Sequence, residues 1–452
     1  MKLSGPAVVL PAADSVHNPV PIQPRVIGNR QAVPSAGVAS GSSQPVPHSG
    51  WIVIGAAVAL LLKLVISCST FGTNDVMTFY GFGRSLSEHG LGWTYGHGIV
   101  WLSSTSAFNH PPMIAYFVRA IYRLSQSEAL KSAGITFPLL LRLPAIVADF
   151  GTTLAMLALC KQNALLRSHR WALVLFAVSP VSIMVSGFHG NTDPVMVFFL
   201  VTSCYFACRG QALLCGILFA LSCQVKVIPL LFLPVFVFFW WHHHGTRAFL
   251  VAMVMVSVAL CWEPLTQFPA LLIKNVLTYS SYWGLWGVTY WLRLTGVPHF
   301  VNVWYENFSM PQKIIAAGLK MLIAGSVVGI GWRRRALGGA ALMESLGYGW
   351  MVFFVFSPGV CAQYLVWLAP FVLVLSPTFY GWLTLTSSVF LFFFYNTISH
   401  GLPWYLGVST SQLNLIWTPW ALWPWAALIL GAIILYRRRC TTGTPLPTEI
   451  PT

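Results

Sequence analysis

From residue 51 onward the chain consists largely of apolar runs separated by short polar turns. A helix that crosses a bilayer needs about 20 mostly apolar residues, and in lipid its backbone polar groups must be satisfied within the segment. The runs are found at 51–70, 138–160, 171–187, 194–208, 211–225, 228–241, 247–262, 312–331, 338–356, 364–378, 379–398 and 416–436. They predict an all-α protein, a polytopic transmembrane helical bundle of about twelve spans. An alternative with roughly ten or eleven spans requires one pair of runs to be re-entrant.

The composition excludes a soluble protein. Charged residues make up only 8% of the chain and apolar residues 56%, whereas soluble domains carry about 25% charged residues. The net charge of +15 would indicate nucleic-acid binding in a soluble protein, but in a membrane protein it indicates basic cytoplasmic loops. We therefore expect no nucleic-acid partner. Most of the nine cysteines lie inside apolar runs, which predicts neither a disulfide framework nor a zinc site.

The charges separate onto two sides of the predicted membrane. If the N-terminal segment is cytoplasmic, the turns on that side hold more than half of the 25 basic residues, including 333–335 and 437–439. The other side holds most of the ten acidic residues, namely Asp75, Glu88, Glu128, Asp193, Glu263 and Glu306. This asymmetry satisfies the positive-inside rule and predicts that both termini are cytoplasmic.

Three segments follow from these patterns. Residues 1–50 are rich in Pro, Ser and Gly, which predicts a disordered cytoplasmic tail; we expect no cleaved signal peptide there. Residues 51–436 form the transmembrane domain, and 437–452 form a basic cytoplasmic tail. Two long connections, 71–137 and 263–311, fall on the outer side and are rich in Trp and Tyr. They predict interfacial amphipathic helices, whose aromatic rings form a membrane-interface belt, line a substrate site, or both.

Asp75 follows the first apolar run, in the sequence Phe71-Gly72-Thr73-Asn74-Asp75. Gly72 permits a turn at the end of the first span, so the Asp75 carboxylate would lie near the outer membrane surface. There it could act as a general base that takes a proton from a hydroxyl nucleophile. The alternative is a structural role as a helix N-cap or an exposed loop acid.

Three polar residues, His189, Asn191 and Asp193, lie between the third and fourth runs, followed by Pro194. Proline suits the first turn of a helix, so Asp193 is either the cap of the next helix or part of a polar site at the membrane surface. The two interpretations are compatible.

Two basic residues on the outer side are candidates for binding an anion. Lys226 lies between the fifth and sixth runs, where it either extends toward lipid headgroups or binds a lipid-linked phosphate. Arg293, in the second long connection, is a second candidate for the same phosphate.

Other charges lie inside the runs, where one at a helix centre costs about 2.5–3.5 kcal/mol. Arg142 and Asp149 are in the second run, and their spacing places them on one helix face, as an ion pair or an orienting pair. Lys63 and Lys320 have no partner that the sequence identifies.

The turn before the tenth run reads Ser357-Pro358-Gly359, and Gln363 and Tyr364 follow it on the next helix. They either reach a polar cavity or anchor the helix at the interface. Residues 242–244 are three consecutive histidines, which a helix would not direct at one ion. With no metal, nucleotide or dinucleotide motif in the chain, we expect no metal and no cofactor.

Together these motifs resemble the GT-C superfamily of integral membrane glycosyltransferases, which use polyprenyl- or dolichyl-phosphate-linked sugars. The resemblance covers residues 51–436 and leaves the N-terminal tail unexplained. It rests on Asn74-Asp75, Asn109-His110-Pro111-Pro112, the segment 189–194, Gln224-Val225-Lys226, and Ser357-Pro358-Gly359 followed by Gln363-Tyr364.

The resemblance implies an inverting transfer of a hexose, with mannose favoured, to a lipid-linked glycan or glycolipid acceptor at the extracytoplasmic face. Asp75 would be the general base, and Lys226, His189 and Arg293 would stabilise the lipid phosphate as its charge develops. The residues that would contact the sugar or acceptor are Asn74, His110, Asn191, Asp193, Gln363 and Tyr364. The single first-loop acid agrees with a metal-independent donor and argues against the protein O-mannosyltransferase branch, which has a paired-acid motif.

Two other classes share parts of this pattern. A transporter or flippase of a lipid-linked molecule would also have many spans and intramembrane charges, but it should show repeated halves and helices interrupted near the midplane. A non-catalytic assembly subunit is the other alternative if Asp75 is structural. The sequence does not identify the sugar, the acceptor or the oligomeric state. A bacterial inner membrane is favoured over the endoplasmic reticulum.

Overall fold

The computed structural model describes residues 49–99, 108–160, 169–277, 282–303, 307–408 and 421–441. The predicted N-terminal tail lies outside these residues apart from 49–50, which begin the first helix, and so does most of the C-terminal tail, 442–452. The described residues form helices joined by short turns, with one pair of two-residue strands.

The first half of the chain supplies the elements that carry most of the predicted site. In chain order they are α1 (Ser49–Ser69), β1 (Gly72–Thr73), α2 (Asn74–Glu88), α3 (Leu91–His97), α4 (Pro112–Ser125), α5 (Glu128–Ser132), α6 (Phe137–Cys160), α8 (Arg170–Ala177), α9 (Pro180–Ser182), the π-helical turn η1 (Ile183–His189), α10 (Asp193–Cys208) and α11 (Ala212–Val225).

The second half continues the bundle. Its elements are the 3₁₀ turn η2 (Ile228–Phe232), α12 (Leu233–His242), α13 (Thr246–Gln267), α14 (Pro269–Leu272), the π-helical turn η3 (Ile273–Leu277), α15 (Gly287–Leu294), the 3₁₀ turn η4 (Pro298–Phe300), α16 (Met310–Arg333), α17 (Gly339–Phe356), the 3₁₀ turn η6 (Ala362–Tyr364), α18 (Leu365–Leu375), α19 (Pro377–Ile398), β2 (Leu406–Gly407) and α21 (Leu422–Thr441).

In the described residues, each of the predicted apolar runs falls on a helical segment. Those long and apolar enough to cross a membrane are the seven described segments Gly50–Ser69, Phe137–Cys160, Arg170–His189, Thr246–Gln267, Met310–Arg333, Gly339–Phe356 and Pro377–Ile398. Shorter apolar helices cover Asp193–Cys208, Ala212–Val225, Ile228–His242, Ala362–Leu375 and Leu422–Arg437. The predicted all-α integral membrane fold is therefore confirmed, whereas the number of full spans stays a prediction.

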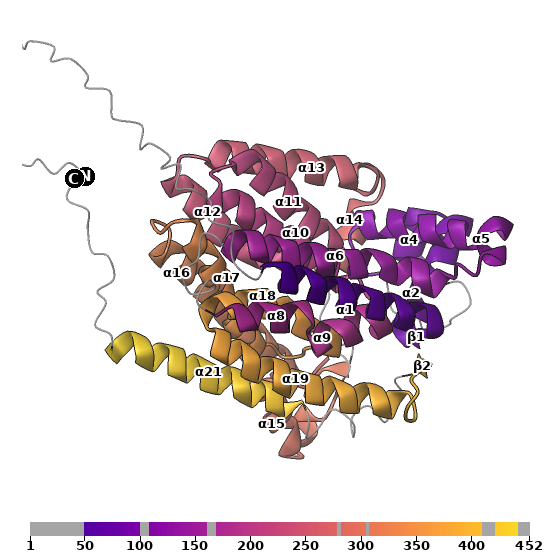
Figure 1. Cartoon of the computed structure of the whole chain (residues 1–452). Helices are drawn as coiled ribbons and strands as arrows, with labels where there is room; N and C mark the ends of the chain where they lie inside the picture. Colours follow the sequence, from indigo (N-terminus) through magenta and orange to yellow (C-terminus); the bar gives the residue numbers. More distant parts are fainter. Residues whose placement is uncertain are drawn as a thin grey trace, which may run out of the picture. The chain divides into compact units, whose positions relative to one another are not determined.

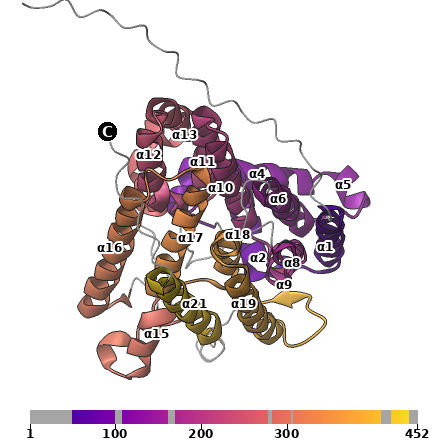
Figure 2. The ribbon, with the colours of Figure 1, turned by 60° about the vertical axis from the view of Figure 1, so that its left-hand side comes forward.

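The helices pack in two connected groups. In the first, α1, α6, α10, α11 and α13 each contact the next (Figure 1), and in the second, α16, α17, α18, α19 and α21 do the same (Figure 2). α10 joins the groups through contacts with α17 and α18. α13 exposes Val251, Val254, Met255 and Val258, which suits a helix whose outer face meets lipid because lipid solvates apolar side chains.

Short amphipathic helices lie in the described parts of the two long connections, as predicted. In α4 the side chains of Ile114, Ala115, Val118 and Ile121 are buried, and this spacing is one stripe along a helix. In α15, Tyr290 is buried whereas its neighbour Trp291 is exposed.

The backbone around the first strand requires glycine. Gly72 has φ of +103°, and a Cβ there would lie 2.7 Å from the carbonyl oxygen of Phe188. β1 pairs in parallel with β2, in the register Gly72 with Leu406. The segment that leads to Asp75 is therefore held between β2 and the end of η1.

The predicted pairing of Arg142 with Asp149 is wrong. Asp149 instead accepts hydrogen bonds from Lys63 Nζ at 2.7 Å and from Ser182 Oγ at 2.6 Å, and also from Ser186 Oγ. Arg142 donates only to hydroxyl and carbonyl oxygens among the described residues. Lys63 thus has a partner that the sequence did not identify, 86 residues away on another helix.

Candidate active site

Asp75 lies in the first turn of α2, where Thr73 rather than Asp75 is the N-cap. The Thr73 hydroxyl accepts a hydrogen bond from the backbone N–H of Asp75 at 3.4 Å. The carboxylate is therefore not used as the cap and is free for other contacts. Its side chain is 32% exposed, so a ligand can reach it.

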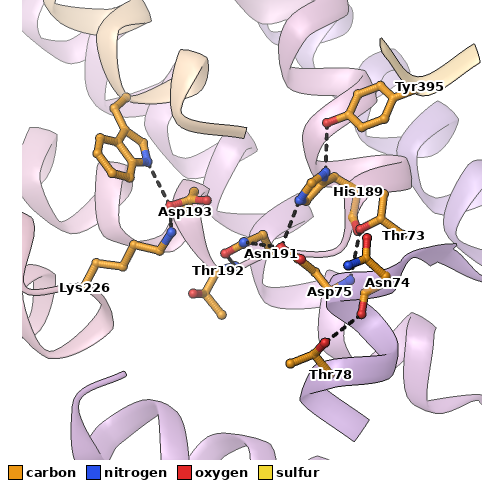
Figure 3. A network of polar contacts seen from close by, with 11 residues as sticks. Thr73, Asn74, Asp75, Thr78, His189, Asn191, Thr192, Asp193, Lys226 and Tyr395 are labelled. Carbon is orange, nitrogen blue, oxygen red and sulfur yellow. Dashed lines mark hydrogen bonds and ion pairs between the residues drawn. The ribbon is translucent and has the colours of Figure 1, made fainter. Parts of the chain in front are cut away.

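A polar network holds one oxygen of the Asp75 carboxylate (Figure 3). Asp75 Oδ2 lies 3.0 Å from His189 Nε2 and 3.1 Å from Asn191 Nδ2. The other imidazole nitrogen, Nδ1, lies 3.0 Å from the hydroxyl of Tyr395. An ionised carboxylate only accepts hydrogen bonds, so His189 Nε2 donates to Asp75, and the contact with Tyr395 at Nδ1 fixes the orientation of the ring.

These contacts set the charge of Asp75. Burial by itself would raise the pKa of the carboxyl. The hydrogen bond and the electrostatic effect of His189, then the charge of Lys226 and the hydrogen bond from Asn191, outweigh it, so the pKa lies below its ordinary value. Asp75 is thus an ionised base at neutral pH. Within the described residues, both side-chain hydrogen bonds reach Oδ2, which leaves Oδ1 for a substrate.

Lys226, between α11 and η2, is held by a buried carboxylate and two aromatic rings. Its Nζ lies 2.5 Å from Asp193 Oδ1, 4.7 Å from the ring centre of Tyr364 and 5.3 Å from that of Trp367. Asp193 Oδ1 also accepts a hydrogen bond from Trp367 Nε1 at 2.8 Å (Figure 3). The Tyr364 and Trp367 rings stack with their centres 3.9 Å apart. The ammonium position is therefore fixed before any ligand binds.

Asp75 and Lys226 line the same cavity, which has a volume of about 510 Å³. Its polar lining also includes Asn109, His110, Asn191 and Gln363. The apolar lining comes from several elements and includes Ile228, Leu231, Val276, Leu277, Ile323 and Phe353. The cavity thus offers both charged or hydrogen-bonding groups and apolar side chains to a ligand.

His110 is a neutral member of this lining. Burial lowers its pKa, and the charge of Lys226 lowers it further, to about 3, although Asp75 acts in the opposite direction. The His110 carbonyl accepts a hydrogen bond from the Tyr95 hydroxyl at 2.7 Å. A neutral imidazole in this position can donate a hydrogen bond without adding charge.

The structure separates the predicted site residues into two sets. Asp75, His110, Asn191, Lys226, Gln363 and Tyr364 line the cavity. Asn74 instead lines a second, mainly apolar cavity of about 710 Å³, to which Thr78 also belongs. Since Thr78 borders both spaces, the first turns of α2 form a wall between them.

Besides Asn74, three predicted residues do not line the cavity that contains Asp75. His189 and Asp193 are buried beneath it and bind Asp75 and Lys226. They therefore support charged residues of the cavity rather than face a ligand directly. Arg293 lies on α15, with its side chain packed against Gly284. Direct binding of phosphate or sugar by these residues stays a prediction.

Sequence reasoning did not identify Tyr395, and it left Lys320 unexplained. Tyr395 contacts His189 across 206 residues, and no local pattern indicates such a contact. Lys320 lies on α16 and lines the same cavity as Asp75. The sequence feature that pointed to Lys320 was its charge inside an apolar run, because such a charge requires a polar environment.

No group of three or more His, Cys, Asp or Glu side chains within the described ranges is arranged to hold a metal ion. Of the consecutive histidines 242–244, His242 ends α12 and the other two lie in the turn before α13, where His243 Nε2 contacts the carbonyl of Leu337 at 3.3 Å.

The sequence is similar to known mannosyltransferases. Residues 80–242 match the family model of the alpha-(1->6)-mannopyranosyltransferase N-terminal domain. GPI mannosyltransferase 1 of Kluyveromyces lactis is 21% identical over 256 residues, which cover 53% of this chain and 60% of the relative. The match thus spans about three fifths of that curated relative. The predicted resemblance to mannosyltransferase-like membrane glycosyltransferases is confirmed.

Two solved structures of ArnT from Cupriavidus metallidurans align with most of this chain. The one bound to undecaprenyl phosphate is 14% identical, with a TM-score of 0.47, and the match covers 88% of this chain and 79% of that one. The apo structure is 15% identical, also with a TM-score of 0.47, over 88% and 78% of the two chains.

Proposed function

We propose that this protein transfers a hexose, with mannose favoured, from a polyprenyl- or dolichyl-phosphate-linked donor to a lipid-linked glycan or glycolipid acceptor. The observation that carries the proposal is the shared cavity, in which a carboxylate base, Asp75, and a fixed cation, Lys226, face one space that is also lined by many apolar side chains. The match of residues 80–242 to a mannosyltransferase domain supports the reaction class.

The reaction is an inverting displacement. Asp75 accepts the proton of an acceptor hydroxyl as that oxygen attacks the anomeric carbon of the donor sugar. The bond between this carbon and the phosphate oxygen breaks on the opposite face, and the bonding electrons leave with the lipid phosphate. Lys226 stabilises the negative charge that develops on the phosphate, and because its ammonium is already fixed by Asp193 it needs little reorganisation.

The lining of the cavity supports a donor that is part lipid. A phosphate beside Lys226 would leave the prenyl chain to lie along Ile228, Leu231, Ile323 and Phe353. The sugar would meet the hydrogen-bonding groups of Asn191, His110 and Gln363. Asn74, Tyr80 and Met77 on the other face of α2 line the second cavity, where we place the acceptor lipid, so that its hydroxyl group approaches Asp75 past Thr78.

The reaction takes place at the extracytoplasmic face, with both termini of the chain in the cytoplasm. The distribution of Lys and Arg supports this orientation. We favour a bacterial inner membrane over the endoplasmic reticulum, and we propose that neither a metal ion nor another cofactor takes part.

The test uses the full-length protein purified in detergent or lipid, with polyprenyl-phosphate mannose and a glycolipid extract as substrates. Asp75→Asn should reduce the transfer rate by about 10²–10⁴-fold while the protein expresses and folds. Glu88→Gln is the matched control, since Glu88 is an exposed acid of the same helix that pairs with Arg84, and it should transfer at the normal rate. Full activity of Asp75→Asn refutes the mechanism. Movement of the donor lipid across vesicles without sugar transfer would favour a flippase.

A further inference from the structure

Arg142 is a fully buried arginine on α6 that the proposed reaction does not use. Its side chain has 0% exposure, and α6 is one of the helices long enough to cross the membrane. A charge in such a position is costly unless its hydrogen-bonding capacity is met. The hydrogen-bond partners of Arg142 therefore indicate its role.

All the N–H groups of the guanidinium are used. Nη1 donates to Thr70 Oγ1 at 2.8 Å and to the carbonyl oxygens of Gly187 and Phe188 at 2.9 and 3.3 Å. Nη2 donates to the carbonyl oxygens of Ser67 and Thr70 at 3.0 and 2.6 Å. Nε donates within its own helix to the carbonyl oxygen of Pro138 at 3.0 Å.

These acceptors belong to the two segments that bring the Asp75–His189 pair together. Ser67 and Thr70 end the first span and lead into Gly72, Thr73 and Asp75, whereas Gly187 and Phe188 are the last residues of η1 before His189. A second contact joins the same segments, because the Thr73 hydroxyl donates to the His189 carbonyl oxygen at 2.8 Å. Arg142 thus connects the end of α1 to the end of η1.

The acceptors are all neutral oxygens, so Arg142 is not there to neutralise a carboxylate. What they need is a planar group with donors in two directions, which arginine offers and lysine does not. π-helical turns such as η1 leave irregular backbone carbonyls and are frequent at functional sites. The guanidinium satisfies two carbonyls of this irregular segment next to His189.

We propose that Arg142 is a positioning residue that sets the distance and orientation between Asp75 and His189 by binding the backbone on both sides. The inference rests on the proposed function for its kinetic consequence, but the geometry of the pair can be tested without turnover. If Arg142 is altered, the His189 ring moves relative to the carboxylate, and Asp75 loses its principal stabilising hydrogen bond.

The experiment compares Arg142→Gln and Arg142→Lys in the full-length protein. A misplacement of about 1 Å can cost about 10²-fold in rate, so we expect Arg142→Gln to lower kcat by about 10²-fold while the donor KM changes by less than about threefold. Arg142→Lys keeps the charge but reaches only one group of carbonyls, and we expect a fall of about tenfold. The acid limb of the pH–rate profile should move to higher pH in both variants.

A measurement that does not depend on activity is an infrared titration of protein with ¹³C-labelled aspartate. The spectrum of the same variant carrying Asp75→Asn is subtracted, so that only the signal of Asp75 remains. The pKa of Asp75 should be higher in both Arg142 variants than in the parent. The charged and titratable groups around Asp75 stay the same in every comparison: His189, Lys226, His110, Asp193, Cys361 and Tyr395.

Arg334→Gln is the matched control. Arg334 binds Glu344 and Ser345 at the opposite end of α17 from Ser357, so its loss should change stability but neither the pH profile nor the Asp75 titration. The inference is overturned if a folded Arg142 variant keeps the parent's Asp75 titration, whatever its rate. If Arg142→Gln does not fold, the Asp75 titration of Arg142→Lys tests the inference instead. If the parent transfers no sugar, the proposed function fails while the titration still tests Arg142.

Discussion

Among the residues that the structure describes, two largely buried lysine–aspartate pairs have nearly equal geometry and different surroundings. Lys63 Nζ lies 2.7 Å from Asp149 Oδ2, and Lys226 Nζ lies 2.5 Å from Asp193 Oδ1. The first pair is enclosed by serine hydroxyls and borders a space of only about 30 Å³. At the second pair, Lys226 lines the cavity of about 510 Å³ that also contains Asp75.

The difference shows that a buried ion pair does not by itself indicate a functional site. Both lysines sit in or beside apolar runs, and the residues near them in the sequence are alike. What separates them is the space beside the ammonium: room for about one water at Lys63, and room for a phosphate and part of a lipid at Lys226. We expect the first pair to contribute to stability and the second to catalysis.

Lys63→Met should produce the largest effect, on stability. Removing one partner leaves the Asp149 carboxylate unpaired in the bundle, which lowers the free energy of unfolding by about 3–5 kcal/mol. The double variant Lys63→Met with Asp149→Leu removes the unpaired charge and should recover most of the loss. Denaturant titration in detergent measures both. Unchanged stability of the single variant, or a lower rate per folded molecule, would contradict the distinction between the pairs.

Lys226→Met should act mainly on the reaction. Loss of a fixed group that stabilises developing charge typically costs about 10²–10³-fold, or about 2.7–4 kcal/mol, and we expect this fall in kcat/KM for the donor. Lys226→Arg keeps a cation near the phosphate and should retain more activity. Steady-state kinetics with varied donor concentration measures the effect, and a parent-like kcat/KM would place the phosphate elsewhere.

His189→Asn tests whether the imidazole keeps the pKa of Asp75 low. In the parent, the hydrogen bond from His189 lowers the pKa of Asp75 and burial raises it. Without the imidazole, burial is less opposed, so the carboxylate takes up its proton at higher pH and the acid limb of the pH–rate profile moves upward. We expect kcat to fall by about 10–10²-fold. His243→Asn, in a turn away from the cavity, is the control and should leave the profile unchanged. If the acid limb does not move in His189→Asn, His189 does not control the pKa of Asp75.

Tyr395→Phe should have the smallest effect. It removes one hydrogen bond to His189 Nδ1, typically worth about 0.5–1.5 kcal/mol, so we expect a rate a few-fold lower with the same donor KM. Rate measurements at saturating donor test this. A loss as large as that of Asp75→Asn would mean that Tyr395 contacts the substrate.

Several residues of the candidate site were predictable because their charge or polarity stands out from an apolar background. Asp75, Asn191, Lys226, Gln363 and Tyr364 are examples, and all of them line one cavity. Arg293 and Asn74 attracted attention for the same reason but lie elsewhere. A polar residue near a predicted membrane surface therefore indicates a candidate, but not the side of the helix on which it faces.

By itself, the sequence determined that this protein is a helical membrane protein, because apolar runs in lipid must satisfy their own backbone hydrogen bonds and only a few structures do so. Only the tertiary structure decided which charged groups meet. Lys63 and Asp149 are 86 residues apart, Asp75 and His189 114, and His189 and Tyr395 206. Such contacts depend on how helices pack against one another, through many weak contacts spread over several helices, and no local pattern encodes them.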